Sequence, residues 1–167
     1  MVLYRRRQQA KAPLKSDKHE VTWSSLGQNA STTQSVVLAV GVASADKDSS
    51  SEVEVGAHIR NVYIEFNVSA ETITSTKVFH WWLKYDYSGQ TDENPNSYYQ
   101  AQRSQVLKRG MEMLVKDVST QTKRIISVRI PPKFSRMTMS TGLKFQYIAS
   151  SSESINVCGF AIYKEFY

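Results

Sequence analysis

The sequence of 167 residues contains a single cysteine, four prolines and seven glycines. It has no apolar run close to the ~20 residues that a membrane-spanning helix needs. The lone Cys158 excludes a disulfide framework. The segment after Met1–Arg7 turns polar without the apolar stretch of a secretory signal, so we expect no secretion signal. Hydrophobic residues make up 41% and charged residues 22%, which excludes wholesale disorder and fits one globular domain.

Positive charge is concentrated at the N-terminus. Residues 1–18 carry six basic side chains against Asp17 alone, a net charge of +5 out of the formal +6 of the chain. The same segment contains Pro13, adjacent glutamines and few large apolar side chains, which indicates a disordered arm. A basic arm on a nearly neutral body is typical of proteins that bind nucleic acid, an acidic membrane surface or a transport receptor.

Beyond the arm, short runs of alternating apolar and polar residues are separated by Ser, Thr, Gly and Asn clusters. This pattern predicts β-strands joined by turns. In the run from Asn61 to Val68 the even positions are apolar and the odd ones mostly polar, so one face of this strand is expected to be buried. The expected strands are Glu20–Ser25, Ser35–Ala43, Asn61–Val68, Lys77–Asp86, Met111–Asp117, Arg124–Ile130, Gly142–Ala149 and Ile155–Phe166.

About eight antiparallel strands in residues 19–167 predict an all-β fold, with a single jelly-roll sandwich as the first choice. A barrel of another topology is the alternative, because periodicity identifies strands but not their connections. Ser97–Arg109, between an Asn-Pro-Asn turn and Gly110, is the segment with a helical pattern. Residues 35–43 and 155–166 are apolar on both faces, which predicts strands covered on both sides or at a subunit contact.

Catalytic and metal sites find little support in the sequence. His19, His58 and His80 are far apart and lie in no metal-ligand spacing, and His80 among aromatic neighbours indicates a structural histidine. Cys158 in an apolar strand is expected to be buried and structural. Asp46–Glu52 begins like a calcium loop but lacks its glycine and its final glutamate. Without a phosphate loop, a nucleophile elbow or a close carboxylate pair, we expect no enzyme activity, no metal and no cofactor.

A second basic feature is Val118–Ser152, which contains six basic side chains and no acidic one. This stretch is either an ordinary solvated face or a nucleic-acid surface. On a strand, Lys123 and Arg129 point away from Ile126. The candidate nucleic-acid-binding residues of the arm and of this stretch are Arg5, Arg6, Arg7, Lys11, Lys15, Lys18, Lys123, Arg124, Arg129 and Lys133.

Several stretches are similar to one known family. They are Lys108–Thr120, Lys123–Ile125, Val128–Pro131, Arg136–Met137, Ser152–Gly159, Ile162–Phe166 and Tyr63–Ser69. Together they resemble the capsid (coat) proteins of small circular single-stranded DNA viruses that encode a replication initiator (Rep). The resemblance implies a jelly roll that self-assembles into a small icosahedral shell, with an inward basic arm that binds the single-stranded DNA genome.

The same resemblance places the protein in the virion, with assembly in the nucleus if the host is eukaryotic. Many relatives carry a longer and denser arginine tail, so the basic stretch after Val118 could supply further genome contacts. Assembly is expected to use contacts between folded bodies, with Trp82 and the Asp92–Asn96 loop as candidate contact elements.

Two other functions stay open at this point. One is a non-viral jelly-roll binding module, such as a lectin-like or cytokine-like oligomer, for which Trp81, Trp82 and Asp86 are the weak candidate carbohydrate site. The other is a hydrolase or isomerase on a β scaffold, which the missing catalytic constellation disfavours.

Overall fold

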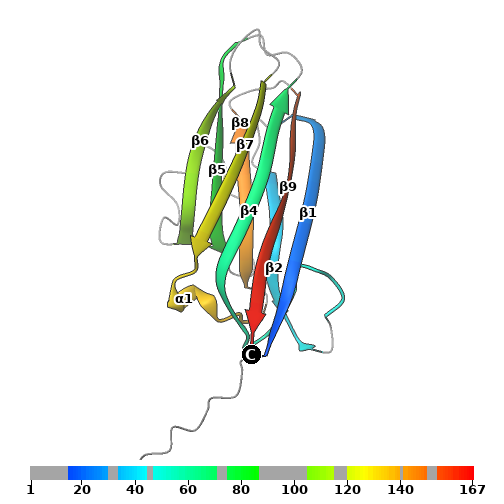
Figure 1. Cartoon of the computed structure of the whole chain (residues 1–167), viewed down its shortest axis with the longest axis vertical. Helices are drawn as coiled ribbons and strands as arrows, with labels where there is room; N and C mark the ends of the chain where they lie inside the picture. The colour runs from blue at the N-terminus through cyan, green and yellow to red at the C-terminus, as the bar shows by residue number, and fades with distance from the viewer. Residues whose placement is uncertain are drawn as a thin grey trace, which may run out of the picture.

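The computed structural model describes residues 15–29, 34–44, 47–70, 75–86, 105–114, 120–139, 141–149 and 154–167, with the backbone alone at 25–29, 86, 120 and 154. Within these ranges the chain forms nine strands and one short helix (Figure 1). In chain order they are β1 (Ser16–Asn29), β2 (Gln34–Val42), β3 (Glu52–Glu54), β4 (His58–Ala70), β5 (Lys77–Asp86), β6 (Val106–Leu114), β7 (Thr120–Arg129), α1 (Pro132–Ser135), β8 (Gly142–Ala149) and β9 (Ser154–Phe166).

The strands form two sheets that face each other, in the orders β1-β9-β4-β7 and β3-β2-β8-β5-β6. Apart from the short β3, the first strand pairs with the last, and the nesting continues inward as β2 with β8, β4 with β7 and β5 with β6. All four of these pairs are antiparallel. Nested antiparallel pairing across two sheets is the topology of a jelly roll, so the predicted fold class is confirmed.

Several expected elements differ from those observed. Residues 106–109, expected at the end of a helix, belong to β6, while 97–104 and the 92–96 loop lie outside the described residues. The observed helix is α1, which begins at a proline, as first helical turns tolerate. The short β3 was not predicted, and it pairs with β2 in parallel.

The boundary of the arm also differs. Strand β1 begins at Ser16, and Ser16, Asp17 and Lys18 pair with Phe166, Glu165 and Lys164 of β9. The expected boundary after Lys18 is therefore too late, since these three residues belong to the folded body. Residues 1–14 lie outside the described residues, so disorder of that part of the arm stays a prediction.

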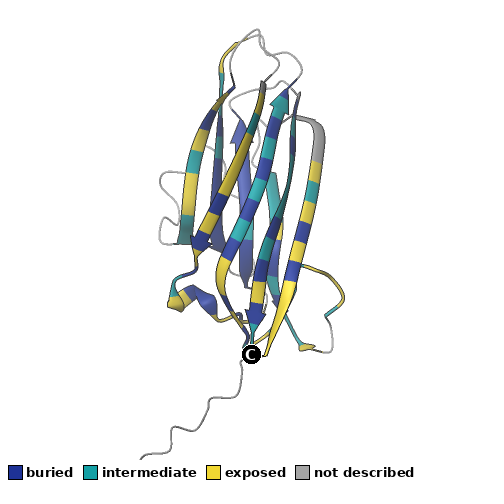
Figure 2. Ribbon diagram, in the orientation of Figure 1, coloured by how far each residue is buried: buried dark blue, intermediate teal, exposed yellow. Residues whose placement is uncertain are grey.

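Alternation along the strands places the core between the sheets (Figure 2). In β4 the side chains of Val62, Ile64, Phe66 and Val68 are at most 1% exposed, whereas the residues between them face outward. Across the sheet, Ile64 is the register partner of Ile126 on β7 and of Ala161 on β9. The register predicted from the period of two is therefore confirmed in this sheet.

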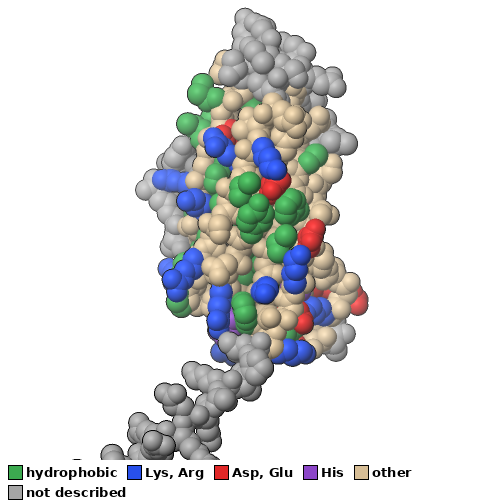
Figure 3. Space-filling model, in the orientation of Figure 1, with side chains coloured by type: hydrophobic (Ala, Val, Ile, Leu, Met, Phe, Trp, Pro, Cys, Tyr) green, Lys and Arg blue, Asp and Glu red, His purple; other side chains and the backbone are tan. Residues whose placement is uncertain are grey.

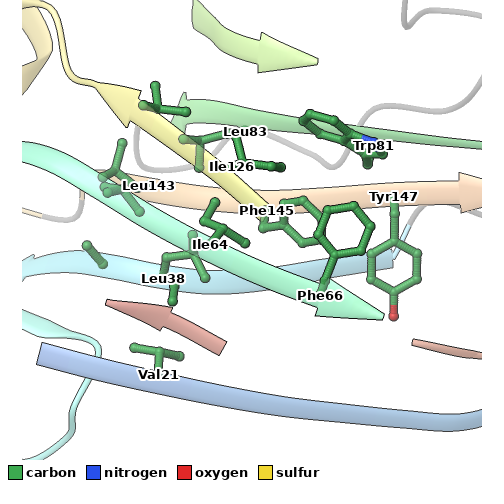
Figure 4. Packing of buried hydrophobic residues seen from close by; sticks show 14 of the residues in the cluster. Val21, Leu38, Ile64, Phe66, Trp81, Leu83, Ile126, Leu143, Phe145 and Tyr147 are labelled. Atoms are coloured by element: carbon green, nitrogen blue, oxygen red, sulfur yellow. The ribbon is translucent and has the colours of Figure 1, made fainter. Parts of the chain in front are cut away.

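Aromatic side chains fill the middle of the core (Figure 4). The ring of Phe66 lies 5.1 Å from that of Phe145 and 5.7 Å from that of Trp81, between centroids. Because aromatic pairs contribute about 0.5–1.5 kcal/mol each beyond their buried area, this cluster fixes the two sheets against each other.

Trp82 lies on the other face of β5, where it was expected to be an exposed assembly contact. The structure contradicts this expectation, because Trp82 is fully buried against Ile148. Its indole N–H donates to Oε1 of Gln146 at 2.8 Å. The pair of tryptophans therefore serves packing on both faces of β5, which leaves neither indole open as a carbohydrate platform.

A buried carboxylate ties the start of β1 to the end of β9. Glu165 is 0% exposed, and its Oε2 accepts hydrogen bonds from Nζ of Lys47 and Nε2 of His19, both at 2.6 Å. Its Oε1 accepts the backbone N–H of Glu54 at 2.7 Å. Burial alone would raise the pKa of Glu165, but these three hydrogen bonds together hold the pKa below its ordinary value.

His19 completes this arrangement. Its ring stacks on Tyr163 with centroids 4.8 Å apart, and Nδ1 lies 2.9 Å from the carbonyl oxygen of Ser50. The ring therefore links β1 to the loop before β3 as well as to β9.

Candidate nucleic-acid interface

The arm joins the body beside the C-terminal residue. The backbone carbonyl of Lys15 accepts the N–H of Tyr167 at 3.1 Å, and the Lys15 ammonium lies 5.1 Å from the centre of the Tyr167 ring. Lys18, three residues later, is exposed and forms an ion pair with Glu20 at 3.6 Å. The other candidate arm residues, Arg5, Arg6, Arg7 and Lys11, lie outside the described residues.

Lys123 and Arg124 are exposed, at 60% and 53% side-chain exposure, but each is paired with a carboxylate. Nζ of Lys123 lies 2.6 Å from Oε1 of Glu65 on the neighbouring β4. This hydrogen bond lowers the pKa of Glu65 and raises that of Lys123. Arg124 points to the opposite side of β7 and contacts Glu112 of β6. The stretch Val118–Ser152 contains no acidic residue of its own, but carboxylates from β4 and β6 neutralise two of its positive charges.

Arg124 and Glu112 also line a shallow pocket of about 310 Å³ between β6 and β7. Trp81 contributes to its wall, with its indole nitrogen 3.4 Å from Oε1 of Glu112. A Cβ at Gly110 would stand 2.1 Å from the Trp81 ring, so glycine at this position lets the indole lie against β6. The ionised groups Arg124 and Glu112 at this pocket bind each other and hold the sheets together.

Arg129 and Lys133 lie elsewhere, at the lower end of the sandwich in Figure 1, where β7 ends and α1 follows. Both side chains are exposed, and Nζ of Lys133 lies 4.6 Å from the centre of the Phe134 ring. The structure thus separates the four candidates of the basic stretch into two pairs. Lys123 and Arg124, near the middle of β7, have their charges compensated by carboxylates, whereas Arg129 and Lys133 lie at the end of β7 and in α1.

Three further basic residues accompany this second pair. Sequence analysis missed Arg60 and Lys164, and it counted Arg136 in the basic stretch but not among the candidate binding residues. On β4, Arg60 is next to Asn61, which is the register partner of Arg129 on β7. On its other side, β4 pairs with β9, and a register shift between Ile59 and Val62 puts Arg60 opposite Lys164. Arg136 forms a β-bridge with His58 at the start of β4. All three cations are exposed. We name the whole group the basic cluster; its members are Arg60, Arg129, Lys133, Arg136 and Lys164.

Figure 3 shows Lys and Arg side chains gathered at the lower end of the face formed by β1, β9, β4 and β7, below hydrophobic side chains in its middle. The residues of that middle patch project outward from β4, β7 and β9. Tyr63 and Phe160 are half-buried with ring centroids 6.1 Å apart, and Ile125 beside them is 59% exposed. We name Tyr63 and Phe160 the aromatic pair.

The structure also describes the surroundings of other residues that were considered in the sequence. Cys158 is half-exposed, contrary to expectation, and its Sγ lies 3.4 Å from Oγ of Ser24. Burial lowers the pKa of His80. The carboxylate of Glu52 accepts the backbone N–H groups of Asp48 and Ser49, so it caps its own loop. In the described part of the chain, no group of three or more His, Cys, Asp or Glu is placed to hold a metal ion.

Within the same described ranges, no helix is long and apolar enough to cross a membrane.

No protein-family model matches the sequence, and no curated protein matches it. A chain from the structure of Desmodium yellow mottle tymovirus is 8% identical, with a TM-score of 0.44 over 93% of this chain and 90% of that one. A chain from the cryo-EM structure of mud crab tombus-like virus is 10% identical, with a TM-score of 0.36 over 96% and 95% of the two chains. The fold assignment therefore rests on the nested strand pairing.

Proposed function

We propose that this protein is a viral coat protein that self-assembles into a small icosahedral shell and packages single-stranded DNA. The observation that carries the proposal is the combination of a jelly-roll body with a basic N-terminal arm that joins it at the end bearing the basic cluster. The family resemblance of residues 58–167 supports the same function. A non-viral jelly-roll binding module is the alternative.

Assembly is assigned to the folded body. A closed shell needs repeated contacts between rigid surfaces, and a segment of low hydrophobicity and high charge supplies few of these. The body offers exposed apolar side chains on both sheets, among them Met111 and Met113 on β6 at 57% and 60% exposure and Ile125 on β7. Exposed apolar patches of this kind mark interaction surfaces.

The arm is assigned to the genome. Arg5, Arg6, Arg7, Lys11 and Lys15 can each neutralise one phosphate, and contacts of this kind carry no base information. The protein is then a constituent of the virion, with no catalytic residue and no cofactor, and with the nucleus as the assembly site in a eukaryotic host.

Nuclease protection tests the proposal. Full-length protein is mixed with circular single-stranded DNA, treated with nuclease, and separated by size-exclusion chromatography. DNA that survives and co-elutes with large particles is expected. The triple variant Arg5→Ala, Arg6→Ala, Arg7→Ala should form particles with less protected DNA. If wild-type protein protects no DNA and elutes as a small discrete oligomer, the coat-protein function is wrong and the alternative function, a jelly-roll binding module, is favoured.

A further inference from the structure

The basic cluster is assembled by strand register rather than by sequence. Lys164, Arg60 and Arg129 come from three neighbouring strands, β9, β4 and β7. Adjacent strands are about 4.8 Å apart, so the three side chains form a row roughly 10 Å long across the sheet. Lys133 and Arg136 extend the row from the segment that follows β7.

The charges of the cluster are uncompensated within the described part of the chain, where no carboxylate lies within ion-pairing distance of these five side chains. The carboxylates nearest along the strands have other partners. Glu165 faces inward to His19 and Lys47, and Asp17 accepts a hydrogen bond from the Tyr167 hydroxyl. Lys123, by contrast, is neutralised by Glu65.

The aromatic pair lies further along the same sheet face, with Tyr63 one outward-facing position from Asn61 on β4 and Phe160 two from Lys164 on β9. Tyr63 follows Asn61 on β4, and Phe160 lies beyond Ile162 on β9. Both rings are partly exposed. Cations that follow a phosphate backbone beside aromatic rings that accept unpaired bases are the two elements of a single-strand binding surface.

Like charges on this face disfavour a second copy of the chain as the occupant. A two-fold contact centred here would bring the cations of one copy close to those of the other, which costs several kcal/mol unless an anion separates them. A polyanion instead gains from each cation through the release of its counterions.

We infer that this end of the β1-β9-β4-β7 sheet face is a second binding surface for single-stranded nucleic acid, with phosphates on the basic cluster and bases against the aromatic pair. The inference rests on the proposed function and deepens it, because it makes this sheet face the inner wall of the shell. The arm then enters from the same end, where Lys15 contacts Tyr167.

The test uses full-length, unassembled subunits and labelled oligo-dT and oligo-U of about 16 nucleotides, in fluorescence anisotropy across a salt series from ~50 to ~200 mM. The double variant Arg129→Gln, Lys164→Gln removes two exposed cations of the cluster. Its slope of log affinity against log salt should flatten by about 1.4, from ~0.7 per contact, with both oligonucleotides. Affinity at ~50 mM salt should fall at least ~10-fold.

The matched control is Lys108→Gln, Arg109→Gln, which removes two exposed cations from β6 of the other sheet. Its slope should equal that of wild type. Phe160→Leu should weaken binding by ~5-fold or more without changing the slope, because stacking is insensitive to salt. Retained β-type circular dichroism in each variant ensures that binding is compared between folded proteins.

The outcomes separate this inference from the proposed function. If the arm variant Arg5→Ala, Arg6→Ala, Arg7→Ala flattens the slope by about 2 and the cluster variant leaves it unchanged, the second surface is wrong and arm-based packaging stands. If the β6 control variant flattens the slope as much as the cluster variant does, the assignment of the binding surface to the basic cluster is wrong. A slope change with only one of the two oligonucleotides overturns the phosphate-based mechanism. Absence of salt dependence in every protein overturns nucleic-acid binding altogether.

Discussion

Arg124 of β7 and Glu112 of β6 join the two sheets at their open edge through a bidentate ion pair. Nε of Arg124 lies 2.6 Å from Oε1 of Glu112, and Nη2 lies 2.6 Å from Oε2. The carboxylate is buried at 6% side-chain exposure, whereas the guanidinium is 53% exposed. The geometry makes this pair a structural link between the two sheets.

Replacing Arg124 should therefore affect stability. Arg124→Ala leaves the Glu112 carboxylate buried without its partner, which we expect to lower the free energy of unfolding by about 1–3 kcal/mol. Lys123→Ala, on the adjacent residue, removes an exposed ion pair with Glu65 and should cost at most about 1 kcal/mol. Urea denaturation of both variants measures the difference. Equal effects would mean that the inter-sheet pair contributes no more than an ordinary surface pair.

The buried Glu165 predicts a dependence of stability on pH. Its pKa in the folded protein is below the ordinary value of 4.5, so the unfolded state binds more protons in the acid range and stability falls as pH falls. The contribution is fully present above about pH 4.5 and is lost as pH drops through the lowered folded-state pKa. Unfolding free energies of wild type and Glu165→Gln, measured from pH 7 downward, should differ most at pH 7 and converge in acid. A constant difference would contradict the assigned role.

Neighbouring substitutions on β7 test the register. Ile126 is 5% exposed and faces the core, whereas Ser127 is exposed. Ile126→Asp buries an unpaired charge at a cost of several kcal/mol, comparable to the total stability, so we expect no soluble protein. Ser127→Asp should express and melt close to wild type. Similar losses from both would show that β7 is covered on both faces.

Two truncations test where the arm ends. Deletion of residues 1–14 should preserve cooperative melting and particle formation but yield empty or poorly filled particles. Deletion of residues 1–18 also removes Ser16–Lys18 and their pairing with β9, so it should cost about 2 kcal/mol more, at ~1 kcal/mol for each hydrogen bond that is lost. Melting curves and light scattering compare the two. Particles lost on the shorter deletion would assign assembly to the arm.

Much of the fold could be predicted from the sequence because alternation is a local property of a strand. The expected limits Lys77–Asp86 and Gly142–Ala149 coincide with β5 and β8. The parallel β3 could not be predicted, because its three residues are too few to show a period. Trp82 was misplaced because both faces of β5 are buried, and a period of two does not distinguish a covered outer face from an exposed one.

The candidate site was predicted only in part, because charge compensation depends on register between strands. Nothing local to Lys123 and Arg124 indicates that Glu65 and Glu112 lie within ion-pairing distance of them. Likewise, Arg60 and Lys164 are far apart in the chain, and only the register of β4 with β9 brings them together. A search for isolated exposed cations near predicted strand ends would have identified both as candidates.

Negative-stain electron microscopy of purified full-length protein, combined with light scattering, tests the central claim of a self-assembling coat protein most directly. Because the proposed coat protein would close into a shell through repeated contacts between rigid bodies, uniform round particles of one diameter are predicted. Monomers or small discrete oligomers at every protein and salt concentration tested would contradict the account and favour a binding module.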